Sequence, residues 1–161
     1  MPNPNISDEE LDQLDHPIAR LLKGVAVQVS TTLQAPTLRK LVLAIDYDNT
    51  LDNTSYPGVG RIPEVALVVL QQLREDGHEL ILWTCREGLE LTAAVNNLRQ
   101  QGFVFDFVNR NADSTLDWMA GDSRKIFAHF YLDDRAALRT YERIDWVEFY
   151  YQVVQAAIRP S

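Results

Sequence analysis

Short continuous apolar runs alternate along this chain with longer segments in which apolar residues recur every three or four positions. The short runs, each bounded by polar residues, predict buried strands over residues 41–46, 79–83, 103–108 and 128–132. The longer segments predict three helices: one between Pro63 and Gly77, one over residues 88–101 that ends at Gly102, and one over residues 144–158. Strands and helices therefore alternate through most of the chain.

This alternation predicts an α/β fold. Repeated strand–helix units imply a mostly parallel sheet with right-handed crossovers, because parallel neighbours need a connection long enough to return to the same edge. Helices that carry one apolar stripe must bury it against the sheet. We therefore expect a three-layer, Rossmann-like arrangement in which helices cover both faces of the sheet.

Residues 1–39 are expected to form an N-terminal helical appendage to a domain at residues 40–161. Ser7 and Glu10 have the spacing of a capping box, which marks the start of a helix. Apolar residues then recur at helical spacing, at Leu11, Leu14, Ile18, Leu21 and Leu22. Pro17 is expected to break or restart this helix. The appendage either packs on the domain or binds a partner.

Size and composition narrow the class of protein. The chain has 161 residues, of which 46% are apolar and 24% charged, which suits a globular core and argues against disorder. Its formal net charge of −8 argues against broad nucleic-acid binding, and no apolar run is long enough to span a membrane. The N-terminus lacks signal-peptide regions and the single cysteine cannot form an internal disulfide, so a cytoplasmic location is expected.

Polar side chains follow three of the predicted strands. Asp46, Asp48 and Thr50 follow the first, Thr84 the second, and Asp133 and Asp134 the fourth, with Lys125 just upstream of it. They are either ordinary turn residues or members of one ligand site at the carboxyl ends of parallel strands. If they meet, the four carboxylates need a cation, since two like charges about 4 Å apart repel by roughly 4 kcal/mol at an effective dielectric near 20. Lys125 supplies one positive charge, and all-oxygen ligands favour Mg²⁺ over Zn²⁺ for the rest.

The ordered set Asp46-x-Asp48-x-Thr50, Thr84, Lys125 and Asp133-Asp134 resembles the haloacid dehalogenase (HAD) superfamily of aspartate-nucleophile phosphatases, over roughly residues 40–158. The resemblance implies that Asp46 is a nucleophile that forms an aspartyl-phosphate. It implies that Asp48 protonates the leaving oxygen and then activates water. It further implies an Mg²⁺ site made by the Asp46 carboxylate, the Asp48 backbone carbonyl and Asp133, with Asp134 in support.

The same resemblance assigns the phosphoryl group to the end of the second strand. Thr84 and the backbone N–H groups of Cys85 and Arg86 would hold its oxygens, and the Arg86 side chain is a further candidate. Lys125 would neutralise charge on the phosphoryl group and on Asp46. Thr50 would brace the loop and help to orient Asp48. We therefore expect an Mg²⁺-dependent phosphatase that acts on a phosphorylated small molecule or macromolecule.

The spacing of the motifs predicts a member without a large cap domain. Little more than one helix separates the first motif from Thr84, and a helix, a strand and a short loop separate Thr84 from Lys125. The patterns at residues 82–88, 133–135 and 145–150 resemble a small bacterial group of HAD hydrolases. An open site would admit a macromolecule or, in a homo-oligomer, a small metabolite covered by a neighbouring subunit.

Other functions fit the sequence less well. A phosphoaccepting receiver domain also gathers Asp, Thr and Lys around Mg²⁺, but its acidic pair follows the first strand and not the fourth. A tyrosine phosphatase would need arginine six positions after Cys85, where this chain has Leu91. A phosphotransferase with the same chemistry and a non-catalytic binding or scaffold protein on the same fold stay open as alternatives.

Overall fold

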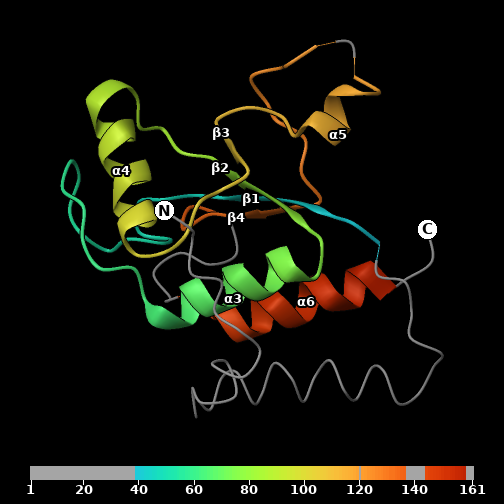
Figure 1. Ribbon diagram of the computed structural model, residues 1–161, viewed down its shortest axis with the longest axis horizontal. Coiled ribbons are helices and arrows are strands. Elements are labelled where there is room, and N and C mark those ends of the chain that lie inside the picture. Colours follow the sequence, from blue (N-terminus) through green and yellow to red (C-terminus); the bar gives the residue numbers. More distant parts are fainter. Residues whose placement is uncertain (1–38, 120, 137–143, 159–161) are drawn as a thin grey trace, which may run out of the picture. The chain divides into compact units, whose positions relative to one another are not determined.

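The computed structural model describes residues 39–119, 121–136 and 144–158. In this part of the chain there are four strands, β1 (Val42–Ile45), β2 (Glu79–Leu82), β3 (Phe107–Val108) and β4 (Phe130–Leu132). There are also four helices, α3 (Glu64–Glu75), α4 (Gly88–Gln100), α5 (Asp113–Leu116) and α6 (Trp146–Ile158) (Figure 1). The helix expected within residues 1–39 lies outside the described residues.

The four strands form one parallel sheet in the order β3-β2-β1-β4. β1 is central, and Ile45 at its end lies beside Leu82 of β2 and Leu132 of β4. All four residues of β1 are buried, as a strand covered on both faces requires. The α/β class and the parallel sheet predicted from the sequence are therefore confirmed, and both are consistent with a Rossmann-like fold.

The predicted helices are present with small changes at their ends. α3 and α4 are followed by Gly77 and Gly102, whose φ angles of 88° and 89° allow the left-handed turn that ends each helix. The third strand is much shorter than the predicted range 103–108, because only its last two residues pair with β2. The four-residue helix α5 was not predicted.

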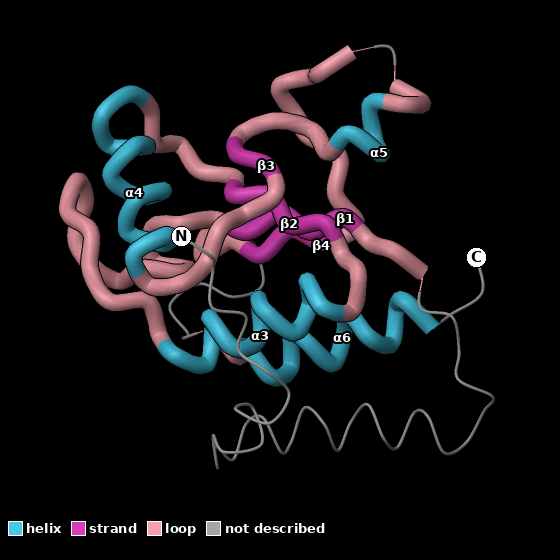
Figure 2. The backbone as a smooth tube through the Cα atoms, viewed as in Figure 1, coloured by secondary structure: helices cyan, strands magenta, loops and turns pink. Residues whose placement is uncertain are grey.

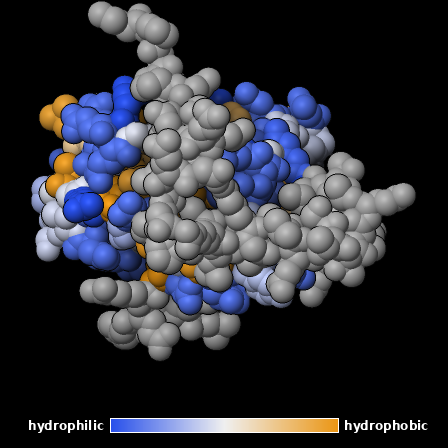
Figure 3. All heavy atoms as spheres, turned by 60° about the horizontal axis from the view of Figure 1, so that its bottom comes forward, coloured by the Kyte–Doolittle hydropathy of each residue, from blue (hydrophilic) through white to orange (hydrophobic). Residues whose placement is uncertain are grey.

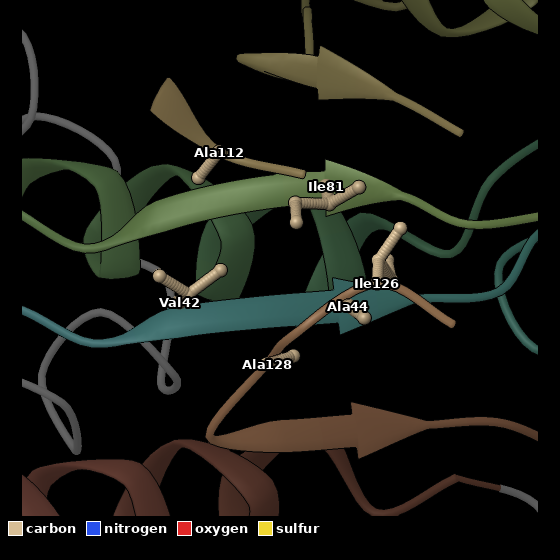
Figure 4. Packing of buried hydrophobic residues seen from close by; sticks show 6 residues of the cluster. All are labelled: Val42, Ala44, Ile81, Ala112, Ile126 and Ala128. Atoms are coloured by element: carbon tan, nitrogen blue, oxygen red, sulfur yellow. The ribbon is translucent and has the colours of Figure 1, made fainter. Parts of the chain in front are cut away.

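The two faces of the sheet are covered by different kinds of segment. α3 and α6 lie side by side along one face (Figure 1), and Tyr150 Oη of α6 donates a hydrogen bond of 2.9 Å to Asp76, just beyond α3. On the other face, apolar residues of the sheet contact the long connection between β3 and β4; the cluster comprises Val42, Ala44, Ile81, Ala112, Ile126 and Ala128 (Figure 4). Within the described residues of that connection, α5 is the one helix.

The order of the strands creates one point where the chain changes direction across the sheet. The chain passes outward from β1 to β2 and β3, and then returns to place β4 on the opposite side of β1. The carboxyl ends of β1 and β4 therefore lie side by side, at the edge of the sheet where open α/β sheets bind their ligands. Figure 2 shows the long loops that join β1 to α3 and β3 to β4.

None of the helices in residues 39–119, 121–136 and 144–158 combines the length and the apolar character needed to cross a bilayer. On the side seen in Figure 3, the described residues are largely hydrophilic, with apolar residues visible in small groups among them.

Candidate active site

The loop after β1 turns sharply and is held by its own backbone. The N–H groups of Leu51 and Asp52 both donate to the Tyr47 carbonyl, at 3.0 and 2.9 Å. Asn49, which lies between Tyr47 and Leu51 in the turn, has a φ of 60°. This is a left-handed conformation that asparagine tolerates better than most residues. The turn leaves Asp46 and Asp48 on the rim of a cavity, while Tyr47 and Leu51 are buried beneath.

Three carboxylates meet at the adjacent carboxyl ends of β1 and β4. Asp46 follows β1 directly, and its N–H donates to the Leu132 carbonyl of β4 at 2.9 Å, so Asp133 and Asp134 come next to it. Oxygen atoms of Asp46, Asp133 and Asp134 lie within 4.8 Å of one another. Such a set of oxygen donors suits a hard divalent cation. The predicted convergence of Asp46 with the acidic pair is therefore present in the structure.

The electrostatics of Asp46 also fit a cation. Burial raises the pKa of its carboxyl group from 3.8 to about 7, and the charges of Asp133 and Asp134 add to this, while hydrogen bonds from Tyr47 N–H and Thr50 oppose it. A carboxylate raised in this way gains strongly from a nearby positive charge. The three residues present thus match the requirements of Mg²⁺ in both ligand type and charge.

Thr50 links the two sides of the acidic cluster. Its hydroxyl donates to Asp46 Oδ2 at 3.2 Å and accepts the N–H of Asp134 at 3.0 Å. The side chain is buried, so both bonds are shielded from water. The predicted bracing role agrees with these contacts, but the partners are Asp46 and Asp134, and Thr50 does not hold the Asp48 side chain.

Asp48 is not part of the group of three carboxylates and is bound by Arg86. Arg86 Nη2 donates to Asp48 Oδ1 at 2.7 Å and Nε donates to Oδ2 at 3.0 Å, a bidentate pair. Arg86 is only 1% exposed, and this pairing raises the pKa of its guanidinium group. The Arg86 side chain, a candidate for binding substrate phosphate, therefore positions Asp48 instead.

The loop after β2 is ordered by a residue that sequence reasoning missed. Asn109, which follows β3, accepts the Thr84 N–H on its Oδ1 at 2.8 Å. The Arg86 N–H, expected to hold a phosphoryl oxygen, donates to Thr84 Oγ1 at 3.2 Å. Cys85 is exposed and lines the cavity. The sequence signal available for Asn109 was its position directly after the predicted strand that ends at Val108.

Lys125 is not brought to this site. It is exposed, and it is absent from the described residues that line the cavity. The basic side chain found at the acidic cluster is Arg135, whose Nε lies 4.0 Å from Asp134 Oδ1. The expected counter-charge role of Lys125 therefore remains a prediction.

The site opens into a cavity of about 290 Å³. Nine residues line it: Asp46, Asp48, Asn49, Tyr56, Cys85, Arg86, Asp133, Asp134 and Arg135. Six of them were singled out from the sequence as catalytic, binding or metal-ligating residues. Tyr56 was not, because its loop carries no apolar periodicity or motif that would place it near β1.

Comparisons with known proteins bear on the fold and not on the activity. No protein-family model matches this chain, and no curated protein matches it. Among solved structures, a conserved protein from Bacteroides thetaiotaomicron is similar, with 28% sequence identity and a TM-score of 0.61. The match covers 76% of this chain and 100% of the other, so the likeness extends over most of the α/β fold.

Proposed function

We propose that this protein is an Mg²⁺-dependent phosphatase of the HAD type, with a three-layer fold and no large cap, which hydrolyses a phosphate monoester through an aspartyl-phosphate on Asp46. The observation that carries the proposal is the meeting of Asp46, Asp133 and Asp134 at the adjacent carboxyl ends of β1 and β4. A nucleophilic aspartate needs a nearby positive charge that stabilises its carboxylate and offsets the negative charge of the phosphoryl group. A cation bound by these three carboxylates would supply that charge.

Asp46, Asp133 and Asp134, with the Asp48 backbone carbonyl, would hold the Mg²⁺ ion. When bound, the ion offsets the negative charge of the carboxylates and of the phosphoryl oxygens. The chain itself positions these ligands: Thr50 fixes Asp46 against the Asp134 backbone, and the Tyr47 N–H donates to the Asp46 carboxylate.

In the first step, a carboxylate oxygen of Asp46 attacks phosphorus and the bond from phosphorus to the ester oxygen breaks. The leaving oxygen takes a proton from Asp48, which gives the alcohol and an aspartyl-phosphate. Asp48 then accepts a proton from water, whose oxygen attacks phosphorus, releasing inorganic phosphate and restoring the Asp46 carboxylate. Arg86 donates to both Asp48 oxygens and so fixes the orientation of this carboxyl group, while a second lone pair on a carboxylate oxygen can still take and return the proton.

The other expected roles rest on the resemblance together with position. Thr84 and the Cys85 N–H are at the end of β2, beside the cavity that Cys85 lines. Lys125 enters on the resemblance alone and would have to turn toward the cavity.

The test is hydrolysis of a panel of phosphate monoesters by wild type, Asp46→Asn and Asp117→Asn, each with Mg²⁺ or with EDTA. Asp117 is exposed and outside the cavity, so its substitution controls for the loss of one carboxylate. We expect metal-dependent turnover in wild type and Asp117→Asn and its loss in Asp46→Asn. Transfer of phosphate to an added alcohol, without net hydrolysis, would identify a phosphotransferase. No reaction with any ester, from protein that binds Mg²⁺, would contradict the proposal.

A further inference from the structure

The loop at residues 53–61, named here the Tyr56 loop, is fixed to the rest of the domain at several points. Asp52, which is fully buried, accepts the N–H groups of Thr54 and Gly60 at 2.8 and 2.6 Å. From α4, Asn97 Nδ2 donates to the Gly60 carbonyl at 2.9 Å, and Gln101 Nε2, just beyond the helix, donates to it at 3.0 Å. A loop held in this way loses little conformational entropy when a ligand binds.

Arg86, in the loop after β2, also anchors the Tyr56 loop. Its Nη1 donates to the Pro57 carbonyl at 3.0 Å and its Nη2 to the Gly58 carbonyl at 2.7 Å. The same guanidinium group binds Asp48, so the Tyr56 loop and the acid–base residue share one buried cation. The position of the loop is thereby tied to the position of the catalytic groups.

The Tyr56 loop is also tightly packed. A Cβ atom at Gly60 would collide with the hydroxyl group of Thr54 and would lie 3.2 Å from Asp52 Oδ1. At Gly58 it would come within 3.0 Å of the Ser55 carbonyl oxygen. Glycine at these positions allows the backbone to fold back on itself and to present residue 56 outward.

Tyr56 is the side chain that this loop presents to the cavity. One side of its ring faces Arg86, whose Cζ lies 5.3 Å from the ring centroid, and Tyr47 lies against the same guanidinium group at 4.7 Å. Tyr56 is nevertheless 64% exposed and lines the cavity. A rigidly held and largely open aromatic ring is a typical recognition surface for another ring.

The size of the cavity limits what can lie against Tyr56. Its volume of about 290 Å³ is at the lower end of the range of small-molecule sites. A cavity of roughly 150 Å³ accommodates benzene, so there is room for one ring together with a phosphoryl group. A larger group would extend into solvent.

From these observations we infer that Tyr56 forms a subsite for an aromatic ring next to the phosphoryl group, and that the substrate is an aryl phosphate monoester. This inference rests on the proposed function, because it places the phosphoryl group at Asp46. The ring of the substrate packs against Tyr56 while the acidic cluster and the loop after β2 face the phosphoryl group. The substrate is either a free phenolic ester or a phosphorylated tyrosine side chain of a protein, which share this chemistry.

The test compares the binding of phenylphosphonate and cyclohexylphosphonate by calorimetry in the presence of Mg²⁺. The two ligands are close in size, neither can be hydrolysed, and both are dianions when the binding is measured at a pH above the second pKa of each acid. We expect wild type to prefer the aromatic ligand by ~2- to 10-fold, as an aromatic pair contributes. Tyr56→Phe should keep this preference and Tyr56→Leu should lose it. Tyr151→Leu, at an exposed tyrosine of α6, is the matched control and should keep it.

The possible outcomes separate the two proposals. Equal binding of both ligands to wild type, or an unchanged preference in Tyr56→Leu, overturns the aromatic subsite and leaves the phosphatase standing. Binding of neither ligand to folded protein overturns the phosphoryl site and the subsite together. If the preference is found, kcat/KM is compared between phenyl phosphate and a phosphotyrosyl peptide. The ester with the higher kcat/KM identifies the source of the substrate, and either result supports the inference.

Discussion

The ionisation of Asp46 depends strongly on its surroundings. Its carboxyl group has a pKa of about 7 in the folded protein, against an ordinary value of 3.8, because it is buried beside Asp133 and Asp134. Without metal, the folded state therefore holds a proton between about pH 4 and 7 that the unfolded state has released. The contribution of this group to the free energy of unfolding is consequently lost as the pH rises through that interval.

Asp46→Asn should therefore make the metal-free protein more stable at pH 8, because it removes a carboxylate that is unfavourably charged there. The shift of about three pKa units sets an upper limit of ~4 kcal/mol, and solvent around the cluster reduces the expected gain to ~1–2 kcal/mol. The measurement is urea unfolding in EDTA at several pH values. The gain should shrink toward pH 4, and an equal stability of both proteins at pH 8 would contradict the account.

Arg86 should tolerate no conservative replacement. Arg86→Lys keeps the positive charge but cannot donate to both Asp48 oxygens and to the carbonyls of Pro57 and Gly58 at once. We expect a loss of ~1–3 kcal/mol in the free energy of unfolding, since donors to buried groups are removed. We also expect a larger fall in kcat than rise in KM, since Asp48 loses its fixed orientation. Arg99→Lys, at an exposed arginine of α4 outside the cavity, is the control for both measurements.

At the scale of elements, two histidines hold the beginning of β1. The N–H of Leu41 donates to His78 Nδ1 at 3.2 Å and the N–H of Val42 donates to His129 Nδ1 at 2.9 Å. Both rings must be neutral to accept these bonds. Burial lowers the pKa of both imidazoles below the ordinary value of 6.5, with Arg39 contributing at His129.

The contribution of these two histidines to the free energy of unfolding should therefore fall as the pH drops below about 6.5, where the unfolded histidines take up protons that the folded ones resist. The measurement is urea unfolding from pH 7.5 to 5 in the Asp46→Asn background, which removes the opposing titration of Asp46. Addition of His78→Asn, which keeps an acceptor near Nδ1 and does not titrate, should give a shallower slope than this parent. The same slope in both proteins would show that His78 does not contribute.

The elements that were predicted correctly are those with a strong local pattern. β1 is a continuous apolar run, and Gly77 and Gly102 mark the ends of their helices because few other residues adopt a positive φ. β3 was predicted too long because Phe103 and Phe105 have strand-like character but pack edge to face against each other, before the pairing with β2 begins. α5 was missed because four residues are too few to show a helical period.

At the scale of the whole molecule, the sequence indicated which residues meet at the ends of the strands but not how their side chains pair. The meeting of Asp46 with Asp133 and Asp134 follows from the carboxyl ends of neighbouring parallel strands. The pairing of Asp48 with Arg86 joins two loops whose relative position has no local signature. The same holds for Tyr56, which reaches the cavity only because its loop is folded back and fixed by distant residues.

Binding of Mg²⁺ should stabilise the whole domain, because its ligands come from two strands that are distant in sequence. At a free concentration of 100 Kd, a ligand specific for the folded state adds ~2.7 kcal/mol to the free energy of unfolding. For a chain of this size that corresponds to a rise of roughly 5–10 °C in Tm.

Thermal unfolding with and without Mg²⁺ measures this effect. Asp133→Asn should remove most of the rise in Tm, whereas Asp117→Asn should preserve it. The rise should also be larger at pH 8 than at pH 6, since Mg²⁺ needs the Asp46 carboxylate deprotonated. A rise of equal size in Asp133→Asn would place the metal elsewhere.

The exposed thiol of Cys85 has a practical consequence. It is the single cysteine of the chain, and it lies on the wall of the cavity beside Asp48 and Arg86. A maleimide fluorophore would therefore attach at one defined place without any prior mutagenesis. Such a label competes with a ligand for the cavity, whose volume is about 290 Å³, so the rate of labelling, followed by fluorescence, reports occupancy by ions or ligands without turnover.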